Sequence, residues 1–151
     1  MNCHFIVILR IFNKLTGPIP KLPKNLIELE IKSNSLSGSL PKPSFNELTQ
    51  LEVVELSDIS FTGVIPVGLL QPSLQQVNLA NNGFTAIEIS KPINSNLIAV
   101  NVGYNKIVGF LSVNLSAYPM LSSLSLRYNK LYGPIPPGTT KWTGCFWTEI
   151  T

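Results

Sequence analysis

Charged residues are scarce in this chain of 151 residues, at 13% of the sequence, about half of the ~25% that soluble domains carry. Eleven Lys and Arg against eight Asp and Glu leave a net charge of +3. These basic residues are scattered along the chain, which argues against a nucleic-acid interface. Uncharged groups must cover the surface, and the 15 Ser and 14 Asn supply them. This composition is typical of neither a disordered nor a coiled-coil protein.

Long hydrophobic runs are also missing. The longest one occupies residues 5–9 and ends at Arg10, well short of the ~20 residues that cross a bilayer. Four residues before such a short run do not make a secretory signal. We therefore expect no transmembrane segment in this chain and see no signal peptide.

Histidine and cysteine are nearly absent. Because the one His is His4, a histidine-based catalytic triad inside the chain is excluded. Cys3 and Cys145 stand at opposite ends without the spacing of a zinc site. Residues 133–138 have the GxxxxG spacing of a phosphate loop, but Thr139 stands where that loop requires Lys. The sequence predicts no enzyme, no metal and no cofactor.

Leucine, with 21 copies, recurs at a fixed period. The last full unit, residues 121–136, reads LxxLxLxxNxLxGxIP, and the same frame occurs six times. Its Asn positions are spaced 21, 25, 23, 23 and 24 residues apart, a leucine-rich-repeat period. They are occupied by Asn13, Asn34, Ile59, Asn82, Asn105 and Asn129. We divide the chain into a ragged first repeat at 1–20, five repeats at 21–136 and a non-repeat tail at 137–151.

Each position of the frame has a physical role. In the LxL pair, Leu124 and Leu126 face one side of a short strand. The polar residues that alternate with them, Ser123, Ser125 and Arg127, face the other side. One unit cannot bury its apolar side alone, so neighbours stack and share a core. Asn satisfies backbone groups where the chain leaves the strand, Gly accepts an unusual backbone angle, and Pro limits further pairing. The predicted fold is a right-handed, curved α/β solenoid with a concave parallel sheet and an irregular or 3₁₀ convex side.

The LxGxIP endings at residues 13–20, 34–41, 61–66 and 129–136 resemble the plant-type extracellular leucine-rich repeats. The chain is similar to the ectodomains of receptor-like kinases and receptor-like proteins, and to polygalacturonase-inhibiting proteins. The resemblance implies a non-catalytic binding surface, extracellular or at the plasma membrane. The partner it implies is a peptide, a protein ligand or a co-receptor.

Several positions depart from the frame. Ile59 replaces Asn, so we expect the Asn ladder to break between Asn34 and Asn82. Ala86 replaces Gly in the fourth unit and Ser112 replaces Pro in the fifth. Arg10 falls at an inward position of the first unit, which we expect to be frayed or misregistered.

The ends lack the paired cysteines that this family usually carries. Six strands stacked at ~4.8 Å separate the two ends by ~24 Å, and a disulfide tolerates ~7 Å between Cα atoms, so we expect Cys3 and Cys145 not to pair. Together with the missing signal and kinase, this suggests a truncated piece of a longer receptor-like protein. We expect the aromatic side chains Trp142, Phe146 and Trp147 of the tail to cover the open end.

The outward strand positions form candidate binding columns. They run from an acidic end, at Glu28, Glu30, Glu55 and Asp58, to an aromatic and basic end. Because Tyr and Arg are enriched at interface hot spots, the preferred anchors are Tyr104, Arg127 and Tyr128, with Asn78 and Asn101 as hydrogen-bonding groups. The acidic cluster suits a basic peptide. The alternative is that all of these are ordinary solvated strand residues.

Asn114 begins the chain's one N-x-[ST] sequon, at residues 114–116. It falls past the strand, on the convex side, where a glycan would leave the concave face free. The sequon is glycosylated only if the chain is secreted, and such tripeptides also arise by chance.

Three functions remain open. The leading one is a non-enzymatic protein- or peptide-binding module from a plant receptor-like ectodomain. The second is an inhibitor of a secreted cell-wall-degrading enzyme of the polygalacturonase-inhibiting type. The third is a truncated product without an independent role.

Overall fold

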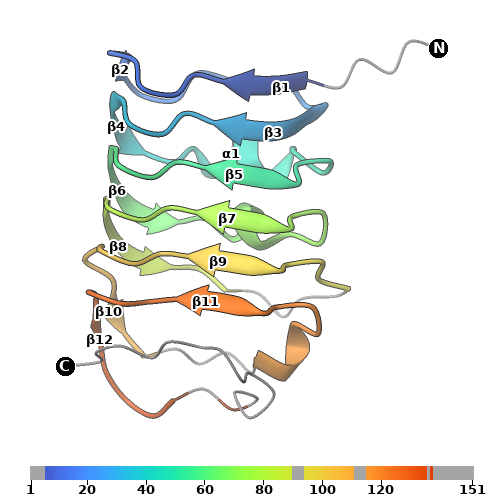
Figure 1. The fold of residues 1–151 in the computed structure, drawn as a ribbon, viewed down its shortest axis with the longest axis vertical. Helices are drawn as coiled ribbons and strands as arrows, with labels where there is room; N and C mark the ends of the chain where they lie inside the picture. The colour runs from blue at the N-terminus through green and yellow to red at the C-terminus, as the bar shows by residue number, and fades with distance from the viewer. Residues whose placement is uncertain (1–5, 90–93, 111–114, 136, 138–151) are drawn as a thin grey trace.

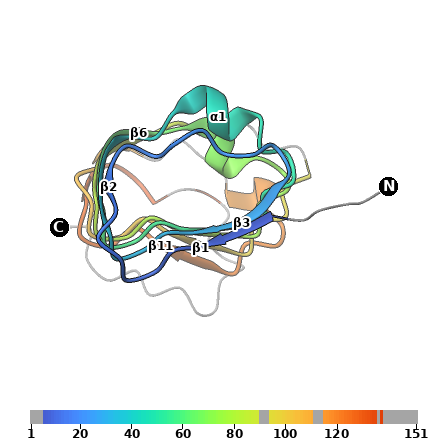
Figure 2. The same cartoon turned by 90° about the horizontal axis from the view of Figure 1, so that it is seen from above.

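A computed structural model describes residues 6–89, 94–110, 115–135 and 137 (Figure 1). The two cysteines, His4, Ser112, Asn114 and the aromatic tail lie outside these residues. The described chain is a parallel β-solenoid, as the repeat predicts. Seen along its axis, one sheet forms one side, a second set of strands forms an adjoining side, and α1 lies opposite the first sheet (Figure 2).

The first sheet contains six parallel strands, one from each repeat, in the order β1-β3-β5-β7-β9-β11. Their bounds are β1 Ile6–Leu9, β3 Leu26–Glu30, β5 Val53–Glu55, β7 Gln76–Asn78, β9 Ala99–Asn101 and β11 Ser123–Ser125. Residues at equivalent positions of the repeat pair across the sheet, as Leu29 does with Val54 and Val77 does with Val100. The register of the strands therefore follows the sequence repeat. We call the outward surface of this sheet the concave face.

The core lies behind this sheet. Inward residues such as Leu29 and Val54 are at most 1% exposed, and burying each such side chain contributes roughly 2 kcal/mol. Phe45, Phe61 and Phe84 are fully buried and belong to the same core. At the two ends the inward side chains are only partly buried, because an end repeat has a neighbour on one side only.

The first repeat continues the sheet. Ile8 pairs with Leu29, as the frame requires, and the pairing is irregular only between Ile6 and Val7. Arg10 occupies an inward position of the frame but is exposed, and its backbone N–H donates to the Glu30 carbonyl at 2.8 Å. The exposed Arg10 side chain therefore does not enter the core.

A ladder of Asn side chains holds the turn that follows each strand. Asn105 is 8% exposed, and its Nδ2 donates to the carbonyls of Leu79 at 3.0 Å and of Val102 and Gly103 at 3.1 Å. Its Oδ1 accepts the Phe84 backbone N–H at 3.1 Å. One side chain thus satisfies backbone groups of two adjacent repeats.

Asn34, Asn82 and Asn129 repeat this pattern. Ile59 has no amide with which to do so, and its side chain packs in the core at 7% exposure. Asn13 lies exposed at the end of the stack and donates to the Ile11 carbonyl at 2.9 Å. The ladder therefore has an apolar rung in the third repeat and a solvated one in the first.

The residue before each Asn position has a left-handed backbone. These residues have φ between 51° and 55°: Phe12, Ser33, Asp58, Asn81, Tyr104 and Tyr128. For residues other than Gly this conformation costs roughly 1 kcal/mol, and in the repeats of Asn34, Asn82, Asn105 and Asn129 the Asn hydrogen bonds hold the turn in place. The sharp turn directs these side chains to one corner of the solenoid, which we call the corner column.

A second group of parallel strands follows the corner, and the sequence analysis did not predict it. One sheet contains β2 Thr16–Gly17, β4 Ser35–Ser39, β6 Ser60–Ile65 and β8 Gly83–Ile87. A separate pair contains β10 Val108–Gly109 and β12 Lys130–Leu131. The LxG part of the repeat endings therefore pairs with its neighbours, on a side of the solenoid for which the sequence predicted no strands. We call the outward surface of these strands the lateral face.

Two glycines of this region, Gly38 and Gly109, are required by backbone angle rather than by space. Gly38 has φ of +96° and Gly109 of +127°, yet a Cβ at either position would meet no atom within 4 Å. In the fourth repeat, where Ala86 takes the Gly position, the pairing of β8 with β6 shifts between Gly63 and Val64. The shift follows the loss of the residue that accepts positive φ.

The convex side carries short helices. These are α1 Lys42–Asn46 and the 3₁₀ helices η1 Val67–Leu70 and η2 Leu115–Ala117. The 3₁₀ turns agree with the prediction, and α1 adds one short α-helix. α1 and η1 pack against each other in adjacent repeats.

Candidate binding surface

A shallow hollow of about 220 Å³ crosses the centre of the concave face. Its floor is made by outward side chains of neighbouring strands, among them Val53, Gln76 and Ala99. The predicted residues Glu30, Glu55, Asn78 and Asn101 line it as well. Small and flat side chains in register on adjacent strands thus leave room for an extended segment across the sheet.

The acidic end of this face is electrostatically crowded. Glu30 pairs in register with Glu55 and lies beside Glu28 on its own strand. Partial burial raises the pKa of Glu30, and its hydrogen bond with Glu28 and the negative charges of Glu28 and Glu55 act in the same direction. Lys32 opposes these effects. The excess of negative charge from Glu28, Glu30 and Glu55 over Lys32 favours a positively charged ligand group.

Replacing Glu30 by Gln is expected to stabilise the protein at pH 7. A carboxyl group with a raised folded-state pKa binds its proton more tightly in the folded chain than in the unfolded chain, so its contribution to stability falls as pH rises above 4.5. The gain in unfolding free energy should therefore shrink as pH falls below 4.5. Urea unfolding across this range measures it. Glu47→Gln is the control, because Glu47 has Lys24 as a partner at 3.3 Å, and an equal gain in both variants would contradict the argument.

Asn78 and Asn101 are partly committed to the fold. The Oδ1 of Asn78 accepts the Ala80 N–H at 3.2 Å, and that of Asn101 accepts the Gly103 N–H at 3.1 Å. The Asn78 Nδ2 also donates to Glu55 Oε2 at 2.9 Å. These bonds fix the amides as rigid groups on the floor of the hollow.

Asp58 lies one step outside the hollow, in the corner column. Its Oδ1 accepts a hydrogen bond from Asn81 Nδ2 at 2.8 Å. This contact links the corners of the third and fourth repeats, and it places the Asp58 carboxylate beside an amide rather than beside Glu28.

The aromatic end is the most organised part of the predicted set. The rings of Tyr104 and Tyr128 stack with centroids 4.4 Å apart and planes inclined by 17°. The Arg127 guanidinium carbon lies 5.0 Å from the Tyr104 ring centroid, a cation–π arrangement. The two rings are 44% and 53% exposed. Stacking holds both tyrosines in one orientation while leaving much of their surface available to a partner.

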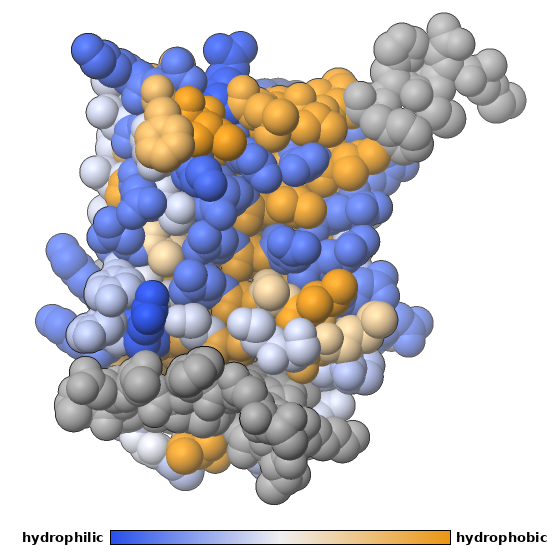
Figure 3. Space-filling model, viewed as in Figure 1, coloured by the Kyte–Doolittle hydropathy of each residue, from blue (hydrophilic) through white to orange (hydrophobic). Residues whose placement is uncertain are grey.

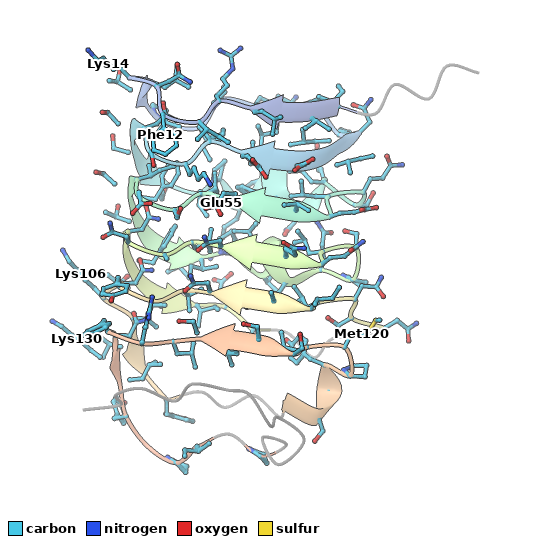
Figure 4. The ribbon with its side chains drawn as sticks, viewed as in Figure 1. Phe12, Lys14, Glu55, Lys106, Met120 and Lys130 are labelled. Atoms are coloured by element: carbon cyan, nitrogen blue, oxygen red, sulfur yellow. The ribbon has the colours of Figure 1, made fainter. Side chains whose placement is uncertain are left out.

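The structure also reveals an apolar concave surface that the sequence analysis did not name. In the first repeat, Val7, Leu9 and Phe12 are 46%, 59% and 79% exposed, and hydrophobic surface gathers at this end of the concave face (Figure 3). Figure 4 shows Phe12 at the corner of the first repeat, two repeats away from Glu55. In the repeat of Asn13 these residues occupy the same outward positions that define the candidate binding columns in the other repeats. The repeat pattern alone could therefore have identified them.

The described residues offer little for catalysis or metal binding. They include no group of three or more His, Cys, Asp and Glu side chains placed to hold a metal ion. In the same part of the chain, no helix has the length and apolarity needed to span a membrane.

Comparisons with known proteins agree with the repeat pattern. No protein-family model matches the chain. It is 29% identical over 126 residues to the calmodulin-binding receptor kinase CaMRLK of Arabidopsis thaliana, covering 80% of this chain and 18% of the relative. It is 34% identical over 131 residues to receptor-like protein 35 of the same plant, covering 84% and 14%. The chain thus spans less than a fifth of the length of these relatives.

Solved structures give the same result. The ectodomain of the Arabidopsis thaliana membrane receptor kinase GASSHO1/SCHENGEN3, in complex with CASPARIAN STRIP INTEGRITY FACTOR 2, superposes with a TM-score of 0.75 at 25% identity, covering 86% of this chain and 16% of that one. The plant peptide hormone receptor RGFR1, in complex with RGF2, superposes at 0.73 and 27%, covering 85% and 22%.

The fold and the repeat endings are those of a leucine-rich-repeat solenoid, similar to the plant extracellular type. Over most of its length the chain is homologous to the ectodomains of plant receptor-like proteins and receptor kinases. It is an ectodomain-like module related to peptide-hormone receptors.

Proposed function

We propose that this chain is a non-catalytic module that binds an extended peptide or protein segment outside the cell. The hollow across the concave face is the observation that carries the proposal. Support comes from the similar ectodomain of RGFR1, whose structure contains the ligand RGF2. A leucine-rich-repeat sheet offers side chains in register at each strand, which suits a ligand lying across several repeats.

The three parts of the face contribute different contacts. The acidic end, with Glu30 and Glu55, attracts a positively charged group of the ligand. The floor of the hollow at Ala99 and Gln76 accepts a small side chain or backbone. The stacked rings of Tyr104 and Tyr128 supply flat apolar area that loses little conformational entropy on binding.

Filling the hollow tests this proposal. Peptides would be selected for binding to the wild-type chain from a random displayed library and then measured by fluorescence anisotropy. Ala99→Trp places an indole in the middle of the hollow, on the outward side of β9, and should raise the Kd of the selected peptides by roughly tenfold or more. Gln50→Trp, at an exposed position between α1 and β5, is the matched control and should leave the Kd unchanged.

Equal binding by both variants would place the peptide site elsewhere and contradict the proposal. Inhibition of a fungal polygalacturonase by the wild-type chain, with no peptide selected, would favour the inhibitor alternative instead.

A further inference from the structure

The last two described repeats carry an apolar and basic surface on the lateral face, separate from the concave hollow. We call it the lateral patch, and it consists of Lys106, Val108, Phe110, Lys130 and Tyr132. Val108, Phe110 and Tyr132 are 57%, 60% and 61% exposed. Such side chains are costly to leave in water, and a cluster of them marks an interaction surface.

At the equivalent positions of the preceding repeats, the side chains differ from those of the lateral patch. Where the last repeats have Val108 and Tyr132, the earlier ones present exposed hydroxyl side chains: Thr16, Ser37, Thr62 and Thr85. Where the last repeats have Lys106 and Lys130, the first repeat has Lys14, the second and third have Ser35 and Ser60, and the fourth has Gly83. The repeat itself therefore does not require large apolar or charged residues at these positions.

The patch is held together by its strands. Val108 pairs with Lys130, and Gly109 pairs with Leu131, in the two-stranded sheet β10-β12. The rings of Phe110 and Tyr132 lie 6.4 Å apart. At Gly133 an added Cβ would come within 3.1 Å of the Phe110 Cβ, so the glycine leaves the space that Phe110 occupies.

Within the part of the chain that the structure describes, neither Lys106 nor Lys130 forms an ion pair. The sequence contains no Asp or Glu between Glu88 and Glu149. Among the described residues the ion pairs are those of Lys24 with Glu47 and of Lys42 with Glu88. Lys106 and Lys130 lie exposed, close together at one edge of the solenoid (Figure 4). Positive charge beside apolar surface is complementary to a negatively charged, apolar partner.

We propose that the lateral patch docks an acidic, aromatic-bearing segment of another protein. The apolar side chains form the centre of the contact and the two lysines pair with carboxylates at its border, the arrangement common in protein interfaces. Because the patch lies around the corner from the hollow, it can act while a ligand occupies the concave face.

The probe for this proposal is a short synthetic peptide of alternating Glu and Tyr, compared with a Lys–Tyr and a Glu–Ser peptide of equal length. Wild-type chain should bind Glu–Tyr more tightly than either. Lys106→Glu with Lys130→Glu should weaken this binding roughly tenfold or more. The control Lys14→Glu changes the equivalent position of the first repeat, where the next outward residue is Thr16, and should have no effect.

A second variant separates the apolar contribution from the charge. Val108→Thr with Tyr132→Thr installs the residue that earlier repeats carry at this position, so it should preserve the fold and still weaken Glu–Tyr binding. The proposal is overturned if Lys14→Glu weakens binding as much as the double lysine variant, or if Glu–Ser binds as well as Glu–Tyr. It is also overturned if a galacturonate oligomer, rather than the Glu–Tyr peptide, binds in a way that depends on Lys106 and Lys130.

Discussion

Replacing Asn105 by Leu is expected to lower the free energy of unfolding by roughly 3 kcal/mol, because buried polar groups left without partners cost about 1 to 3 kcal/mol each. The substitution keeps the side chain's approximate size but removes a donor shared by the carbonyls of Leu79, Val102 and Gly103. It also removes the acceptor for the Phe84 backbone N–H. Chemical denaturation followed by circular dichroism measures the change.

Asn13→Leu is the matched control. Asn13 occupies the same position of the frame, but it is exposed and makes a local bond to Ile11. Its replacement should change the unfolding free energy by less than about 0.5 kcal/mol, the usual range for surface substitutions. Equal losses in the two variants would mean that the Asn ladder does not hold the repeats together.

Gly68→Ala should also destabilise the chain, by roughly 2 to 3 kcal/mol, the upper range for overpacked sites. Gly68 lies buried in η1, where a Cβ would come within 2.8 Å of the Phe45 backbone carbon and 2.9 Å of the Asn46 nitrogen. Backbone atoms cannot rotate away, so α1 and η1 must separate. Thermal and chemical unfolding both report this change.

The control for this prediction is Gly103→Ala. A Cβ at Gly103 would meet only side-chain atoms of Arg127, Asn101 and Ser125, at 3.1 to 3.2 Å. The Arg127 and Ser125 side chains can rotate and no backbone atom is approached, so we expect less than half of the loss at Gly68. A larger loss at Gly103 would show that close backbone approach does not determine the cost of these substitutions.

The sequence predicted the first sheet well because its information is local and periodic. A side-chain alternation in each strand and a repeat of 21 to 25 residues determine which positions pair, and Leu29 and Val54 lie opposite each other as a result. The departure at Ile59 was also visible, because the identity of the residue alone decides whether it can hydrogen-bond.

The second group of strands was missed for a physical reason. The segments around Gly38 and Gly63 combine small residues with positive φ, and their pairing depends on the neighbouring repeat rather than on their own propensity. Short strands of this kind carry almost no hydrophobic alternation. Their presence became clear only from the stacked backbone.

The surface was partly predictable. Outward columns identified Tyr104 and Tyr128, but the left-handed backbone that brings the rings to one corner could not be read from residue identity. The hydrogen bonds that fix Asn78 and Asn101 depend on the backbone two residues farther on. Val7 and Leu9 belong to the ragged first repeat, which departs from the frame at Arg10, so the columns of the five regular repeats do not include them.

The most direct test of concave-face binding is an NMR titration of the wild-type chain with a peptide selected for binding to it. The account predicts that backbone amide shifts concentrate at the outward strand residues around the hollow, including Gln76, Asn78, Ala99 and Asn101. Shifts concentrated instead on α1 and η1, with the sheet unaffected, would contradict it.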